Sequence, residues 1–157
     1  MPKLQPSGDI TDGGWTAETG ALDLSAEIAG LTPTDDSFIK SSNNPENDIA
    51  QMNLANPGEL PRPPVTMFVR ARRRGSAQLY VRLKEGSTVI REWSHANLPE
   101  DFETFSVLLT QAEFDAAVSW DDVYLEIEAD AVSEAVVLDR TAATILVRNG
   151  ETIVLRV

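Results

Sequence analysis

Apolar and polar residues alternate in short segments along most of this 157-residue chain, and this period of two limits its fold more than any other feature. Successive side chains of a β-strand point to opposite faces, so the alternation indicates strands with one buried face. The segments recur roughly every 8–12 residues, which is typical of two-layer β-proteins. The chain is therefore predicted to be all-β, an antiparallel two-sheet sandwich of jelly-roll type, with an open barrel as the alternative.

The clearest alternation lies between residues 65 and 93. Apolar residues share one face at Val65, Met67, Val69 and Ala71, then at Leu79, Val81 and Leu83, and then at Val89 and Trp93, or alternatively at Ile90. Turn-forming residues separate the three segments at 75–76 and 85–87. We predict that these three strands form a β-meander.

Further strands are expected on both sides of this block, together with one short helix. The strands are predicted over Leu22–Ile28, at Phe38-Ile39, and over Ile49–Leu54, Phe105–Leu109 and Val123–Ala129. In the last of these the apolar residues alternate with Tyr124, Glu126, Glu128 and Asp130, which predicts one acidic, solvated face. The helix is predicted between Thr110 and Val118, with Thr110 as N-cap and Glu113 as its capping-box partner.

Both ends of the chain are predicted to lie outside the body of the sandwich, which we place at residues 15–140. Residues 1–14 contain proline and glycine without periodicity, which favours an extended arm, either disordered or ordered on a partner. Residues 141–157 are predicted to form a C-terminal β-hairpin, because Asn149-Gly150 suits a type I′ turn. That turn would place Arg148 opposite Glu151.

Composition excludes several classes of function. With 25 acidic and 13 basic side chains, the formal charge is −12, which makes nucleic acid a poor partner. The absence of cysteine excludes disulfides, thiol catalysis and thiolate metal sites, and one histidine is too few for a histidine-based zinc site. Residues 1–11 lack the apolar stretch of a secretion signal or a membrane span, so we expect no membrane partner.

Arg70, Arg72, Arg73 and Arg74 form the one basic cluster of the sequence. On a strand, Arg70, Arg72 and Arg74 share the outward face and could hold a phosphate, a sulfated glycan or an acidic neighbouring subunit. The favoured alternative is structural: the cluster would lie beside the acidic row on Val123–Ala129 and neutralise it.

Three other candidate sites have plain structural explanations. Asp35, Asp36, Glu46 and Asp48 could ligate calcium, but their spacing fits no EF-hand and a solvated loop is favoured. His95 lies near Asn97, Glu100 and Asp101, yet no nucleophile elbow accompanies it, so a turn histidine is favoured over a general base. Nothing selects two carboxylates for glycoside hydrolysis. We therefore predict no enzyme, no metal and no cofactor.

The aromatic residues offer a second binding hypothesis. Trp15, Trp93 and Trp120 with Tyr80 and Tyr124 could form a platform on which sugars stack, as in carbohydrate-binding sandwiches. Aromatic residues make up 6% of the chain, so the core is expected to use most of them. Tyr80 and Tyr124 fall on predicted outward faces and are the two worth testing.

A recognisable succession of motifs runs from Asp9 to Ser42. It comprises Asp9-Ile10, Gly14-Trp15-Thr16, Ala26-Glu27-Ile28 and Asp35-Asp36-Ser37-Phe38-Ile39 with Ser41. This succession resembles a group of small β-sandwich proteins encoded among the virion genes of tailed bacteriophages and related prophages. The resemblance continues through Arg70-Ala71 and 79–83 to about Ala129. The family pattern has tyrosine where this chain has Phe38, and the hairpin from Ala143 onward is an addition to it.

The resemblance implies a non-enzymatic virion protein: a capsid decoration protein, a head fibre or spike base, or a neck or tail component. Its partners would be capsid, portal, neck or tail subunits and sister copies in a homo-oligomer. The terminal hairpin is the expected contact element, because its apolar Ile145, Val147, Ile153 and Val157 need cover. Trp15, which opens the first apolar segment after the arm, is a further candidate contact. The alternative function is a carbohydrate-binding module used for adhesion.

Overall fold

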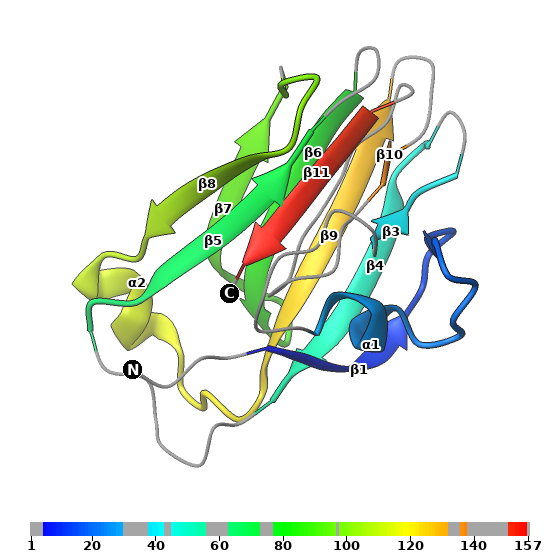
Figure 1. The fold of residues 1–157 in the computed structure, drawn as a ribbon. Helices are drawn as coiled ribbons and strands as arrows, with labels where there is room; N and C mark the ends of the chain where they lie inside the picture. The colour runs from blue at the N-terminus through cyan, green and yellow to red at the C-terminus, as the bar shows by residue number, and fades with distance from the viewer. Residues whose placement is uncertain are drawn as a thin grey trace.

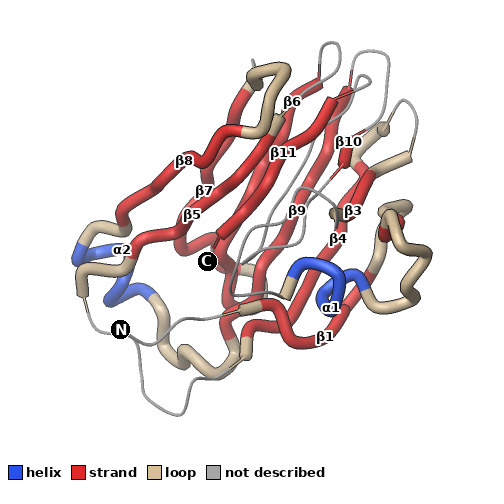
Figure 2. Tube along the Cα trace, viewed as in Figure 1, coloured by secondary structure: helices blue, strands red, loops and turns tan. Residues whose placement is uncertain are grey.

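The computed structural model describes residues 5–29, 38–42, 45–55, 63–72, 77–96, 98–131, 136–137 and 151–156. Its strands form two sheets stacked face to face (Figures 1 and 2). The strands are β1 (Pro6–Thr11), β2 (Thr16–Ala17), β3 (Ile39–Lys40), β4 (Asp48–Leu54), β5 (Thr66–Ala71), β6 (Ala77–Glu85), β7 (Thr88–His95), β8 (Glu103–Leu108), β9 (Val123–Ala131), β10 (Val136–Val137) and β11 (Glu151–Arg156). The helices are α1 (Leu24–Ile28) and α2 (Gln111–Ala116). The predicted all-β sandwich is confirmed.

Among the described residues, one sheet has five strands in the order β1-β4-β9-β6-β7, and every neighbouring pair in it is antiparallel. The other has six strands in the order β2-β3-β10-β11-β5-β8. Its pairs are antiparallel except for β10 and β11, which run parallel. In Figure 1, β8, β5 and β11 lie in front, and β7, β6, β9 and β4 lie behind them.

The core fills the space between the two sheets. Met67 and Val69 of β5 contribute from one side, and Leu125 and Ile127 of β9 from the other; each is at most 2% exposed. Full burial of an aliphatic side chain of this size contributes about 1.5–3 kcal/mol. The period of two therefore identified the core residues of these strands correctly.

The predicted meander is wrong at its first connection. β6 and β7 do form an antiparallel hairpin, but β5 belongs to the opposite sheet and pairs with β8 and β11. The hairpin contains a bulge: Leu83 pairs with Arg91 and Lys84 with Val89, so Ile90 is an extra residue. Ile90 is 5% exposed and Val89 is 46% exposed, so the alternative with Ile90 facing the core is correct.

The strand predicted over Leu22–Ile28 is a helix. Asp23 caps α1, its carboxylate accepting a hydrogen bond from the backbone N–H of Ala26. A second carboxylate, from Asp9 of β1, accepts from the backbone N–H groups of Leu24 and Ser25 at 2.5 and 2.7 Å. These two caps satisfy N–H groups that a helix start leaves unpaired, and they stabilise a turn that local alternation could not indicate.

The predicted capping box of the other helix is confirmed. Thr110 Oγ1 accepts from the backbone N–H of Glu113, and the Glu113 carboxylate accepts from the backbone N–H of Thr110 at 2.7 Å. The described part of the chain thus contains two short helices where one was predicted. Neither helix, within the described part of the chain, has the length or apolar character that a membrane crossing requires.

The described ends of the chain belong to the sandwich. In the predicted arm, β1 is extended but pairs with β4, so residues 6–11 are an edge strand of the five-stranded sheet. In the predicted hairpin, β11 lies between β10 and β5, inside the six-stranded sheet. The other strand of that hairpin, its Asn149-Gly150 turn, and the residues Arg148, Ile145, Val147 and Val157 lie outside the described residues.

Candidate functional site

Polar side chains occupy the outer face of the five-stranded sheet. Alternate residues of its central strands are buried, namely Leu79, Val81 and Leu83 on β6 and Val123, Leu125, Ile127 and Ala129 on β9. The residues between them therefore face outward. These outward positions are Gln78, Tyr80, Arg82 and Lys84 on β6 and Tyr124, Glu126, Glu128 and Asp130 on β9. We call this surface the polar face.

Strand register arranges the polar face in rows that cross the sheet. The first row holds Ile49, Glu128, Tyr80 and Ser94, and the second holds Gln51, Glu126, Arg82 and Glu92. The third row holds Asn53, Tyr124, Lys84 and Val89. The middle row is thus flanked by a tyrosine on each side, one on β6 and one on β9.

Ion pairs and hydrogen bonds hold the middle row together. Arg82 donates to Glu92 from Nε at 2.5 Å and to Glu126 from Nη1 at 3.2 Å, and it also donates to Glu128. Glu126 Oε2 accepts from Lys84 Nζ at 2.8 Å and from Gln51 Nε2 at 2.7 Å. Glu126 is 5% exposed and Glu128 is half-buried, so these two carboxylates are covered by the cations and are not solvated as predicted. Asp130, at the end of the same row, is exposed as predicted.

The network fixes the charges of its members. Burial alone would lower the pKa of Arg82, but its hydrogen bonds to Glu128 and Glu92 outweigh burial and raise that pKa. Burial likewise would raise the pKa of Glu126, yet the hydrogen bonds from Lys84 and Gln51 hold it below the ordinary value. The bond to Glu126 raises the pKa of Lys84. These three groups are therefore charged at neutral pH.

Both tyrosines of the polar face are half-buried and face outward, as predicted. The Arg82 guanidinium carbon lies 5.0 Å from the ring centroid of Tyr80, and Lys84 Nζ lies 5.8 Å from that of Tyr124. The Tyr124 hydroxyl donates to the backbone oxygen of Gly86 at 2.7 Å. Because Lys84 pairs with Tyr124, the two tyrosines are four residues apart along the sheet, or about 13 Å.

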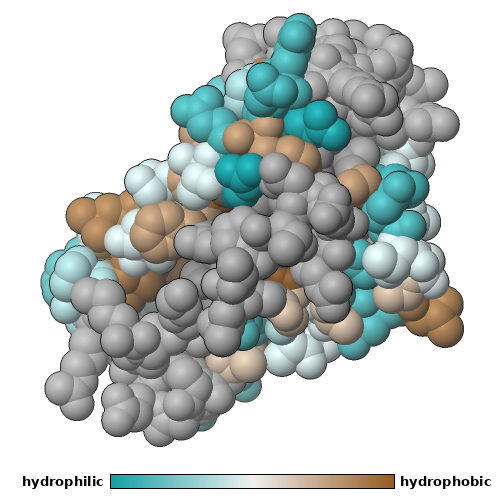
Figure 3. Space-filling view, viewed as in Figure 1, coloured by the Kyte–Doolittle hydropathy of each residue, from teal (hydrophilic) through white to brown (hydrophobic). Residues whose placement is uncertain are grey.

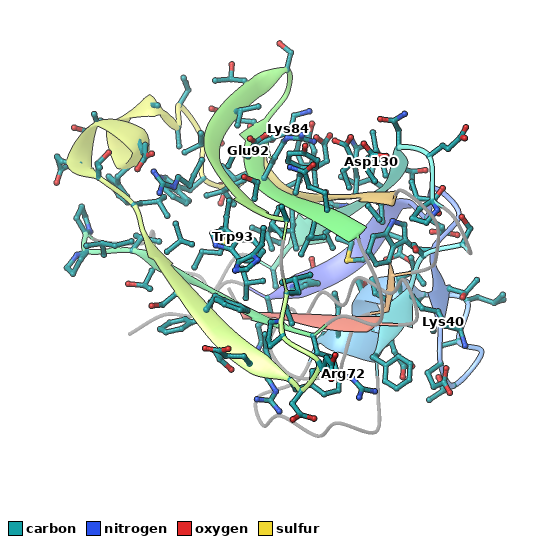
Figure 4. The ribbon with its side chains drawn as sticks, turned by 90° about the horizontal axis from the view of Figure 1, so that it is seen from above. Lys40, Arg72, Lys84, Glu92, Trp93 and Asp130 are labelled. Carbon is teal, nitrogen blue, oxygen red and sulfur yellow. The ribbon has the colours of Figure 1, made fainter. Side chains whose placement is uncertain are left out.

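The predicted pairing of the arginine cluster with the acidic row is wrong. Arg70 and Arg72 belong to the β5 side of the molecule, in the other sheet, and the cations that meet Glu126 and Glu128 come from β6. Figure 4 shows Lys84, Glu92 and Asp130 along one side of the sandwich and Arg72 on the opposite side. The guanidinium carbons of Arg70 and Arg72 lie 5.2 and 4.8 Å from the Phe102 ring centroid. Arg74 lies outside the described residues.

Trp15 lies in the core, where no partner could contact it. The prediction that it is a partner contact is therefore wrong. Trp15 is 3% exposed, and its indole N–H donates to the backbone oxygen of Asp48 at 3.0 Å. Gly13 and Gly14, both with positive φ, bring the preceding turn against β4. The Gly-Trp-Thr motif is therefore explained by packing of this turn on the start of β4.

His95 ends β7 beside two aromatic rings. Its ring centroid lies 5.5 Å from that of Trp93 and 4.9 Å from that of Phe105, and all three side chains are half-buried. Burial lowers the pKa of His95, and the charge of Glu103 opposes this shift. The histidine predicted as a turn residue thus belongs to an aromatic cluster between β7 and β8. We call it the edge cluster.

Of the four loop carboxylates considered as calcium ligands, Glu46 and Asp48 lie within the described residues. Asp48 Oδ2 accepts from the backbone N–H and the hydroxyl of Ser42, at 2.9 and 2.6 Å, and so closes the loop between β3 and β4. Asp35 and Asp36 lie outside the described residues. Where residues are described, no three carboxylate or histidine groups are placed to share a metal ion.

No family model matches this chain, and no curated protein matches it. Among solved structures, it is similar to a carbohydrate-binding module from Cellvibrio mixtus lichenase 5A in complex with cellotriose. The identity is 12%, the TM-score is 0.45, and the match covers 99% of this chain and 95% of that one. It is also similar to a xylan-binding module, at 8% identity and TM-score 0.40 over 94% of each chain. Similarities of this size do not assign a ligand to this chain.

Proposed function

We propose that this chain is a non-catalytic carbohydrate-binding module and that the polar face binds the glycan. One observation carries the proposal: two outward tyrosines flank a row of amide, carboxylate and guanidinium groups whose positions are fixed by mutual contacts. This row and its flanks combine aromatic rings with hydrogen-bonding groups on one rigid element of the fold.

The chemistry of a sugar matches these groups. A pyranose has a rim of hydroxyls that both donate and accept, and faces of C–H groups that pack against aromatic rings. Tyr80 and Tyr124 offer rings with hydroxyls, Gln51 and Asn53 offer amides, and the carboxylates accept while Arg82 donates. Because the tyrosines are about 13 Å apart, the face suits an oligosaccharide of several units better than a single sugar.

The charge of the polar face restricts the kind of glycan. Two cations, Arg82 and Lys84, stand among four carboxylates, namely Glu92, Glu126, Glu128 and Asp130. The face therefore carries net negative charge, as the whole chain does, and repels uronic acids and sulfated sugars. We infer that the ligand is a neutral oligosaccharide.

Pre-organisation favours binding over catalysis at this face. Side chains held by ion pairs lose little further freedom when a ligand arrives, which reduces the entropic cost of binding. A glycosidase, in contrast, needs one carboxyl with a raised pKa as general acid. The pKa of Glu126 is lowered, so this central carboxylate stays ionised and cannot serve as that acid.

Affinity electrophoresis and calorimetry with neutral oligosaccharides test the proposal, with cello-, xylo- and β-1,4-galacto-oligosaccharides as probes. At least one is expected to bind, and Tyr80→Ala and Tyr124→Ala are each expected to weaken binding by roughly tenfold or more. Phe68→Ala is the matched control, because Phe68 is 39% exposed on the opposite sheet. No binding to any neutral glycan, or an equal loss in the control, would overturn the proposal.

The virion role implied by the resemblance stays a prediction. Its partners would be other particle proteins, and residues 143–157 remain the segment to delete in testing it. Loss of particle association in that variant, with a folded body, would support assembly. A glycan-binding face is compatible with such a role, so the two experiments are independent.

A further inference from the structure

The described strands leave the two sheets with four edges, β1, β7, β2 and β8, and these edges differ in how well they are protected. An edge strand exposes unpaired backbone N–H and C=O groups, and proteins block such edges with proline, bulges, short strands or cover by a helix. β1 contains Pro6 and two register shifts, and α1 lies beside it. β7 contains the bulge at Ile90 and contacts α2 through the Arg91–Glu113 ion pair. β2 is protected by its short length, because it has only two residues.

The fourth edge, β8, has none of these protections among the described residues. Its six residues pair with β5 without a bulge, from Glu103 opposite Ala71 to Leu108 opposite Thr66. It contains neither proline nor lysine, and no described strand pairs with its other side. Figure 1 shows it at the margin of the front sheet. Its backbone is therefore suited to pairing with a further strand.

Apolar surface accompanies this edge. Leu108 is 58% exposed and Phe68, on the neighbouring strand, is 39% exposed, both on the outer face of the six-stranded sheet. Figure 3 shows this apolar surface over the β5–β8 side of the molecule. On the inner side of β8, the half-buried edge cluster of Trp93, His95 and Phe105 lies along the same margin.

We propose that β8 pairs antiparallel with β8 of a second copy of this chain, which joins the two six-stranded sheets into one. A twofold axis at Phe105 places Thr104 opposite Ser106 of the second copy and Phe102 opposite Leu108 of the second copy. Opposed pairs of these types stabilise antiparallel strands. The same axis brings the edge clusters of the two copies together, which covers their exposed margin.

Charge favours a second copy as the occupant of this edge. The chain carries −12, so most contacts between two copies would oppose like charges. β8, however, contains one charged residue, Glu103, at its end. Antiparallel pairing puts Glu103 opposite Val107 of the second copy, and the two Glu103 side chains stand about 13 Å apart along the strands. Two copies of this acidic chain can therefore pair along β8 without bringing like charges of that strand together.

Sedimentation velocity over a wide concentration range tests the pairing. The wild-type chain is expected to form dimers as its concentration rises. Leu108→Lys and Ser106→Lys are each expected to raise the dimer dissociation constant roughly tenfold or more. Leu108→Lys replaces the apolar partner of Phe102 by a charge, and Ser106→Lys places two lysines on diagonal positions across the axis, where like charges repel. Leu22→Lys makes the matched leucine-to-lysine change at a residue that is 96% exposed and remote in sequence, and it should dimerise like wild type.

A charge-swap mixture keeps the test sharp if the single variants weaken the fold. Ser106→Lys and Ser106→Glu are expected to be monomeric alone and to form a one-to-one dimer when mixed. Circular dichroism confirms that each variant is folded before it is scored. A wild-type chain that stays monomeric at every concentration, or a dimer that Leu108→Lys and Ser106→Lys leave unchanged, overturns the proposal.

Discussion

Gly13→Ala tests the close packing of the first turn on β4. Gly13 has φ +52°, and a Cβ added there would lie 1.6 Å from the backbone oxygen of Ile49. Since real Cβ contacts are essentially never under 3.0 Å, the turn must move away by about 1.4 Å. That movement breaks the hydrogen bond from the Trp15 indole to Asp48, which is 3.0 Å long.

The expected cost has two parts. An alanine at positive φ costs roughly 1 kcal/mol, and losing the partly buried indole hydrogen bond with its packing adds about 2–3 kcal/mol. Gly86→Ala is the matched control, because Gly86 has φ +56° but nothing within 4 Å of an added Cβ. Gly86→Ala should lower the unfolding free energy only by the roughly 1 kcal/mol that alanine at positive φ costs. Urea denaturation followed by tryptophan fluorescence measures both variants, and equal losses of unfolding free energy would refute the close approach at Gly13.

Two further predictions concern titratable groups. Arg82→Ala is expected to lower the unfolding free energy at neutral pH by about 2–4 kcal/mol, because the buried Glu126 and the half-buried Glu128 then lose a cation that pairs with both. The pKa of Glu126 is lowered from 4.5, so the ionised carboxylate stabilises the fold above that pH and this stabilisation is lost on acidification. Urea titrations at acid pH should therefore show a smaller destabilisation by Arg82→Ala. A destabilisation that is the same at neutral and acid pH contradicts this. The pKa of His95 is lowered from 6.5, so the unfolding free energy of the wild-type chain should fall as pH drops below that value. His95→Phe should flatten this dependence of unfolding free energy on pH. An unchanged dependence in the variant argues against burial of the imidazole.

Local patterns in the sequence predicted local features of the fold. Alternation located the buried residues of β6 and β9, and the spacing of Thr110 and Glu113 located the cap of α2. Features that depend on distant contacts were predicted wrongly. α1 begins where it does because Asp9, fifteen residues earlier, caps it, and alternation over 22–28 carries no trace of that bond.

On the polar face, too, local features could be predicted from the sequence and features set by distant contacts could not. Parity along single strands predicted that Tyr80 and Tyr124 point outward, and the structure confirms it. The order of strands decided which cations meet the acidic row, and parity contains no information on that order. Arg82 alternates with buried residues just as Arg70 does, so only the pairing of β6 with β9 selects Arg82 as the partner of Glu126.

The most direct test of the central claim is a nuclear magnetic resonance titration of the intact chain with the tightest-binding neutral oligosaccharide. If the polar face is the glycan site, amide shifts should change along β4, β9 and β6, around Gln51, Arg82 and Tyr124, while β5 and β8 stay unchanged. Shifts confined to the six-stranded sheet, or no shifts with any neutral oligosaccharide, would contradict the account.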